Sequence, residues 1–78
     1  MRIYLKAYGI AREILGNSVE MELNGTTVQD LRQRLISVYP ELAGLSSLLV
    51  AVNQQYANED TELKPDDEVV LIPPVSGG

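Results

Sequence analysis

The sequence predicts an α+β fold in which one long helix packs against a mixed sheet of about four to five strands. This prediction rests on two observations. Short strand-like segments lie on both sides of the chain's middle, and the single segment between them has apolar residues at helical spacing. The chain has 78 residues, which is enough for one small domain with a modest core.

The first two strands are predicted from alternation of polar and apolar residues. Residues 2–8 and 18–23 each alternate, as is typical of half-buried strands. Residues 9–16 predict a short helical turn that ends at Gly16. This connection is too short for a parallel crossover, so we expect the two strands to be antiparallel neighbours. The apolar residues at helical spacing in the turn are Ile10, Ile14 and Leu15.

The long helix has both a predicted start and a predicted end. Asn24-Gly25 is a turn signal, and Thr27 is a candidate N-cap with Asp30 three residues later, in a variant of the capping box. Pro40 is expected to end the helix, because the residue before a proline disfavours helical geometry. The apolar positions that follow at helical spacing are Val28, Leu31, Leu35, Ile36 and Val38.

The second half of the chain predicts the remaining strands. Residues 48–52 form an apolar run that suits a central strand covered on both faces, with Leu48, Val50 and Val52 in the core, and residues 53–58 continue it toward an edge. After a turn at Pro65-Asp66-Asp67, residues 69–72 form the last strand. This order fits a β-grasp (ubiquitin-like) domain over residues 1–72, followed by an extended tail at 73–78.

Composition excludes several classes of function. The chain has no cysteine and no histidine, which rules out thiolate and imidazole metal sites and Ser-His-Asp catalysis. No acidic segment has the spacing of a calcium loop, so no metal site is expected. A net charge of -5 disfavours binding to nucleic acid or to anionic membranes. No membrane-length apolar run or signal-peptide core is present, and we expect a cytoplasmic protein.

The last residues of the chain are the ones suited to chemistry. Pro73 and Pro74 favour an extended path away from the domain, and Val75 and Ser76 lead to Gly77 and Gly78. Glycines without a Cβ can enter a narrow channel. The terminal carboxylate is a poor electrophile until a partner enzyme adenylates it with ATP; a persulfide or an amine can then attack. No residue of the chain itself is suited to that activation.

Three segments carry a resemblance to a known family. They are residues 67–69 running into 72–78, the segment Ala11-Arg12-Glu13-Ile14-Leu15-Gly16, and Val50-Ala51-Val52-Asn53-Gln54. In this order they resemble the small subunits of molybdopterin synthase, within the wider family of ubiquitin-like sulfur carriers. The C-terminal segment is specific, and the other two are supportive.

The resemblance implies a function, its partners and its site residues. An E1-like adenylyltransferase would use ATP to activate Gly78, a sulfurtransferase would supply sulfur, and the resulting thiocarboxylate would enter a large catalytic subunit. There the sulfur would pass to cyclic pyranopterin monophosphate. The chain would bind no cofactor and would not be catalytic alone. A hydrophobic docking patch is implied at Tyr8, Tyr56 and Ile72, with Arg12 nearby. Some relatives have phenylalanine in this patch, whereas this chain has none.

Several alternatives remain open at this level. The chain could carry sulfur for another pathway, such as thiamine thiazole synthesis, although Pro73-Pro74-Val75 favours molybdopterin. It could be a ubiquitin-like protein modifier or a plain binding module. Arg12-Glu13 could position a partner or form a local ion pair, and the acidic residues 59–68 could steer a basic partner or be a solvated loop. Tyr4 and Tyr39 are predicted to be structural.

Overall fold

The computed structural model describes residues 1–44 and 48–72. The predicted tail, residues 73–78, lies outside the described residues. The elements, in chain order, are β1 (Arg2–Ala7), α1 (Gly9–Leu15), β2 (Ser18–Glu22), α2 (Val28–Val38), a 3-10 helix (Pro40–Gly44), β3 (Leu49–Val52), β4 (Gln55–Tyr56) and β5 (Val69–Ile72).

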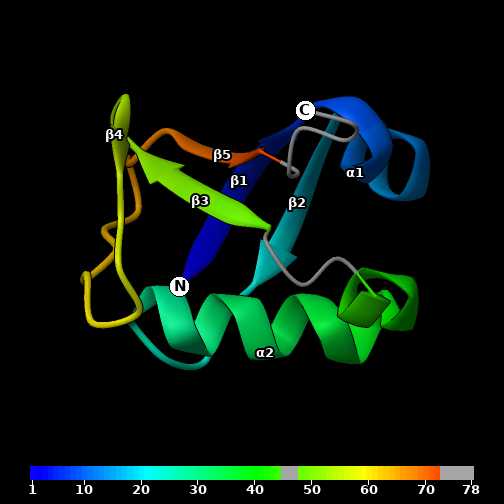
Figure 1. Cartoon of the computed structure of the whole chain (residues 1–78). Coiled ribbons are helices and arrows are strands. Elements are labelled where there is room, and N and C mark those ends of the chain that lie inside the picture. Colours follow the sequence, from blue (N-terminus) through cyan, green and yellow to red (C-terminus); the bar gives the residue numbers. More distant parts are fainter. Residues whose placement is uncertain (45–47, 73–78) are drawn as a thin grey trace.

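The strands form one mixed sheet in the order β2-β1-β5-β3-β4. β1 pairs with β2 in antiparallel register, as predicted, and with β5 in parallel register, while β3 is antiparallel to both β5 and β4. Figure 1 shows α2 running along one face of the sheet, and α1 lying where β1 ends and β2 begins. The predicted fold class, one long helix on a mixed sheet, is confirmed.

The core lies between α2 and one face of the sheet. Alternate residues of β1 point into it, which gives the strand a strict pattern of exposed and buried positions. From the helix, Val28, Leu31 and Leu35 are buried at a spacing of three and four residues. The sheet residues in this core are Ile3, Leu5, Ala7, Met21, Val50, Val52, Val69 and Leu71.

Two predictions about helix faces are wrong. Ile36 and Val38 were expected on the apolar face of α2, yet their side chains are 38% and 44% exposed. At about 100° per residue, Ile36 points away from the stripe that runs through Val28, Leu31 and Leu35. Val38 points in nearly the same direction as Leu31, but it is the last residue of α2 and lies at the end of the helix. In α1 the residue that is fully buried is Ala11, while Ile10 remains 48% exposed.

The predicted cap of α2 is confirmed as a complete capping box. Thr27 Oγ1 accepts a hydrogen bond from the Asp30 N–H at 3.2 Å, and Asp30 Oδ2 accepts from the N–H groups of Thr27 and Thr26. These bonds lower the pKa of the Asp30 carboxyl, the Thr27 backbone donor first. Gly25 is required beside this box, because a Cβ there would overlap the Asp30 carboxyl group.

Arg32 ties α2 to two segments that are distant in the sequence. Its Nη1 donates to the Leu48 carbonyl at 2.6 Å, and its Nε donates to Glu59 Oε1 at 2.7 Å. Leu48 immediately precedes β3, and Glu59 lies in the loop after β4. One side chain therefore holds the beginning of β3 and this loop against the helix.

Candidate functional site

The last strand delivers the chain to a defined place on the domain. β5 runs parallel to β1, and the Tyr8 N–H donates to the Leu71 carbonyl at 3.3 Å. Ile72, the last residue described, therefore lies beside the start of α1. The sequence-predicted tail residues Pro73, Pro74, Val75, Ser76, Gly77 and Gly78 lie outside the described residues. The fold therefore fixes the position of Ile72, after which these residues follow in the sequence.

An apolar patch occupies the sheet face opposite α2, next to this point. The register pairs Ala51 with Val70 and with Tyr56, and pairs Leu49 with Ile72, so these side chains share one face. Tyr8 continues the extended backbone of β1 and lies on the same side as Tyr4 and Lys6. We define the apolar patch as Tyr8, Leu49, Ala51, Tyr56, Val70 and Ile72.

The patch exposes large side chains around a shallow hollow. Tyr8 is 54% exposed, Tyr56 is 72% exposed and Leu49 is 45% exposed. The hollow measures about 270 Å³ and is lined by Ala51, Gln54, Tyr56, Val70 and Ile72. Exposed apolar groups gathered on one face mark an interaction surface. The patch adjoins the end of β5, so a protein that covers it would also receive the segment after Ile72.

The structure brings the predicted docking residues onto one side of the sheet. Tyr56 and Ile72 line the same hollow, and Tyr8 lies where β1 passes into α1. Arg12 follows one helical turn later, with its N–H donating to the Tyr8 carbonyl at 3.3 Å. Arg12 is exposed and lines a separate pocket with Tyr8 rather than the hollow itself.

Sequence reasoning missed Leu49 and Val70 as members of the patch. The run at residues 48–52 was expected to be covered on both faces, but Leu49 is 45% exposed and this part of the prediction is wrong. The available signal was strand alternation, which places Leu49 opposite the buried Leu48 and Val50. A continuous apolar run hides that signal, and Val70 is hidden in the same way between Val69 and Leu71.

Arg12, Glu13, Tyr4 and Tyr39 differ in their structural contacts. Within the described residues Arg12 and Glu13 do not pair, since the cations of the ion pairs there are the Met1 amine, Arg2 and Arg32. Tyr39 packs against the core, as predicted. Tyr4 is 60% exposed, and a hydrogen bond to Glu20 raises the pKa of its hydroxyl. Tyr4 therefore joins β1 to β2 at the surface rather than in the core.

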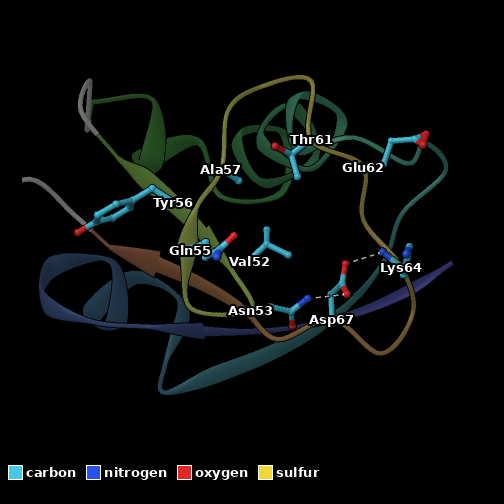
Figure 2. Close-up of a pocket in the computed structure, with 9 residues that line it drawn as sticks. All are labelled: Val52, Asn53, Gln55, Tyr56, Ala57, Thr61, Glu62, Lys64 and Asp67. Atoms are coloured by element: carbon cyan, nitrogen blue, oxygen red, sulfur yellow. Dashed lines mark hydrogen bonds between the residues drawn. The ribbon is translucent and has the colours of Figure 1, made fainter.

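A polar cavity of about 290 Å³ lies between the β3–β4 hairpin and the loop before β5. Figure 2 shows that Asn53 and Asp67 face each other there, while the Tyr56 ring points away from them. Asn53 Nδ2 donates to Asp67 Oδ1 at 3.0 Å, and Asp67 Oδ2 accepts from the Lys64 N–H at 2.8 Å. These bonds, the Asn53 bond first, lower the pKa of the Asp67 carboxyl.

The polar cavity is best explained as a structural connection. Asn53 Oδ1 also accepts from the Glu68 N–H at 3.0 Å, so the side-chain amide joins the hairpin turn to the residue that immediately precedes β5. Asn53 and Gln54 hold positive φ angles of 52° and 70°, as a tight hairpin turn requires. With Glu59 bound to Arg32, the acidic segment 59–68 has internal structural partners.

The part of the chain that the structure describes contains no cluster of acidic side chains suited to hold a metal ion. None of its helices is long and apolar enough to cross a membrane.

Comparison with known proteins assigns the chain to a family. The ThiS family model matches residues 5–78. The molybdopterin synthase sulfur carrier subunit of Chlamydomonas reinhardtii is 39% identical over 83 aligned positions that cover 100% of both chains. The small archaeal modifier protein 1 of Methanosarcina acetivorans has a TM-score of 0.80 at 26% identity, covering 99% of this chain and 96% of that one.

A third similar protein is known in a complex. A chain in the protein–protein complex of subunits 1 and 2 of molybdopterin-converting factor from Helicobacter pylori 26695 matches with a TM-score of 0.70 at 25% identity, covering 100% of both chains. These neighbours confirm the predicted ubiquitin-like β-grasp fold. Curated relatives that resemble this chain from Dictyostelium discoideum, Chlamydomonas reinhardtii and Escherichia coli are molybdopterin synthase sulfur carrier subunits. The chain itself belongs to the ThiS family of ubiquitin-like sulfur carriers.

Proposed function

We propose that this chain is the sulfur-donating small subunit of a molybdopterin synthase, with Gly78 as the residue that carries the sulfur. The observation that supports this most strongly is that the ThiS family model matches residues 5–78, a range that includes Gly77 and Gly78. The substrate that receives the sulfur would be cyclic pyranopterin monophosphate. Catalysis would reside in a large subunit, and the chain itself would require no bound cofactor.

The chemistry begins with activation by a partner. In an E1-like adenylyltransferase the Gly78 carboxylate attacks the α-phosphorus of ATP, and pyrophosphate leaves. A persulfide from a sulfurtransferase then attacks the acyl carbon and displaces AMP. A thiol reductant cleaves the resulting acyl disulfide and leaves the thiocarboxylate. The chain has no histidine or cysteine to perform these steps, so its part is to present the acyl group.

Docking on the large subunit is supported by the position of the apolar patch. Tyr56, Leu49 and Ile72 lie on the face where β5 ends, so one partner could bind the patch and accept the six residues after Ile72 in the same event. Aromatic and aliphatic side chains of this kind are the usual anchors of a protein interface. The similar Helicobacter pylori chain comes from a protein–protein complex of subunits 1 and 2 of molybdopterin-converting factor.

Mass spectrometry of the intact chain tests the proposal. The chain is incubated with ATP, an E1-like enzyme, a persulfide-bearing sulfurtransferase as the sulfur source, and a thiol reductant. The expected result is a mass gain equal to the difference between one sulfur and one oxygen atom, absent from a chain that lacks Gly78. The loaded chain mixed with the large subunit and cyclic pyranopterin monophosphate should then lose that sulfur. An unmodified C-terminus in the presence of an active E1-like enzyme would refute the proposal.

A second candidate function is protein modification, which the likeness to small archaeal modifier protein 1 favours. The same acyl-adenylate would be attacked by a lysine amine, and an isopeptide bond would join Gly78 to the target. Lysine-linked conjugates that disappear when Gly78 is removed would identify this activity. A carrier for thiamine thiazole synthesis would instead pass its sulfur to a different acceptor, so the acceptor assay separates the two sulfur pathways.

A further inference from the structure

A pocket of about 370 Å³ lies between the end of β1, the helix α1 and the start of β2. The register places Lys6 opposite Ser18, and Arg12 lies one helical turn after Tyr8, so strand and helix contribute from two sides. The lining residues are Lys6, Ala7, Tyr8, Arg12, Asn17 and Ser18. Every polar side chain among them can donate a hydrogen bond, two of them carry a positive charge, and none is a carboxylate.

This composition is unusual for so acidic a chain. The sequence has 6 basic and 11 acidic residues, yet two of the bases meet in a pocket that no acidic residue lines. In the described part of the chain, the ion pairs use the Met1 amine, Arg2 and Arg32 as cations, so Lys6 and Arg12 belong to none of them. Lys6 and Ser18 also line a neighbouring groove that contains Asp67 and Glu68, and Arg12 does not line that groove.

This pocket, which we call the Lys6–Arg12 pocket, adjoins the apolar patch. Tyr8 belongs to both, and its N–H is bonded to the Leu71 carbonyl just before the end of β5. A protein that covers Tyr8, Leu49 and Ile72 would extend across Tyr8 to the pocket. Two exposed cations at the border of an apolar contact area are the arrangement expected where a partner presents carboxylates at its interface rim.

We propose that the Lys6–Arg12 pocket receives one or two carboxylate side chains of the large subunit, and so orients the carrier on its partner. The inference rests on the proposed function. The guanidinium of Arg12 can bind a carboxylate through two parallel hydrogen bonds, and the Lys6 ammonium adds a second charge. Asn17 and Ser18, which also line the pocket, supply neutral donors. A second copy of the chain or a polyphosphate is a less suitable occupant, because the net charge of -5 repels both.

The test measures affinity for the large subunit at two salt concentrations. Calorimetry compares the wild-type chain with the pocket variant Lys6→Ala/Arg12→Ala and with the control variant Arg34→Ala/Lys64→Ala. The control removes two exposed basic residues that do not line the pocket and take part in no ion pair of the described residues. We expect the pocket variant to bind roughly 5- to 30-fold more weakly at low salt, and the control to differ from wild type by less than about threefold. The defect should shrink at high salt, because screening weakens the wild-type contact.

Each outcome is decisive. Circular dichroism checks that both double variants are folded. Lys6→Arg, which keeps the charge at this position and leaves the Arg12 guanidinium in place, should retain most of the affinity, and a loss as large as that of the pocket variant would overturn the inference. Equal affinities for the pocket variant and the control would overturn the inference while the proposed function stands. A loss that does not depend on salt would also overturn it, since the contact would then not be ionic. If the wild-type chain itself did not bind the large subunit, the proposed function and this inference would both fail.

Discussion

Replacing Arg32 with alanine is expected to lower the free energy of unfolding by about 2 kcal/mol. The side chain is 28% exposed and donates at 2.6 Å to the Leu48 carbonyl and at 2.7 Å to Glu59. A hydrogen bond from a charged donor contributes about 1.5–3 kcal/mol, and the variant leaves the part-buried carbonyl without this donor. Glu59 is 47% exposed, so its ion pair adds only about 0–1 kcal/mol.

Urea and thermal unfolding followed by circular dichroism measure this effect. For a domain of this size, a loss of about 2 kcal/mol corresponds to a fall in Tm of roughly 8–16 °C. Arg34→Ala is the matched control, because Arg34 lies on the same helix, is exposed, and forms no ion pair within the described residues. Glu59→Gln isolates the ion pair and should cost no more than about 1 kcal/mol.

The reasoning would be refuted if Arg32→Ala and Arg34→Ala unfolded at the same urea concentration. That result would mean that the Leu48 carbonyl finds water or another donor at no cost. A consequence for function also follows, because Leu48 immediately precedes Leu49 of the apolar patch. Loosening the start of β3 should therefore weaken docking on the large subunit in Arg32→Ala but not in Arg34→Ala.

Four further predictions address the cap, the patch and the tail. Because the pKa of Asp30 is lowered in the folded state, its carboxylate stabilises the fold above the unfolded pKa of about 3.9, and this stabilisation is lost as pH falls through the folded pKa. In Asp30→Asn, the urea concentration at the unfolding midpoint should therefore fall less between about pH 6 and about pH 2 than it does in the wild-type chain. Gly25→Ala should destabilise by about 1–3 kcal/mol in urea unfolding, because its Cβ overlaps the Asp30 carboxyl. Tyr56→Asp should weaken binding to the large subunit at least about tenfold by calorimetry while the domain stays folded, and unchanged affinity would remove Tyr56 from the interface. Gly78→Ala should leave unfolding unchanged yet slow activation or sulfur transfer in the mass assay; an unchanged rate would rule out a narrow channel around the tip.

Local features of this chain could be predicted because their causes are local. The alternation in residues 2–8 and 18–23 follows from a strand with one face in the core, and both strands form where predicted. Thr27 and Asp30 form reciprocal hydrogen bonds between side chain and backbone within a single helical turn, so the start of α2 could be predicted without tertiary information. The chemical role of residues 73–78 stays a prediction, which rests on the intrinsic properties of glycine and proline.

Tertiary structure alone decided which surfaces these elements share. Leu49 and Ile72 meet because β3 pairs with β5, and Lys6 meets Arg12 because β1 continues directly into α1 while β2 returns beside it. Arg32 reaches Leu48 and Glu59 only after the helix has packed on the sheet. A sequence pattern reports the period of each segment, whereas exposure depends on the elements that pack against it. For that reason Ile36, Val38 and Leu49 were expected inside and are found at the surface.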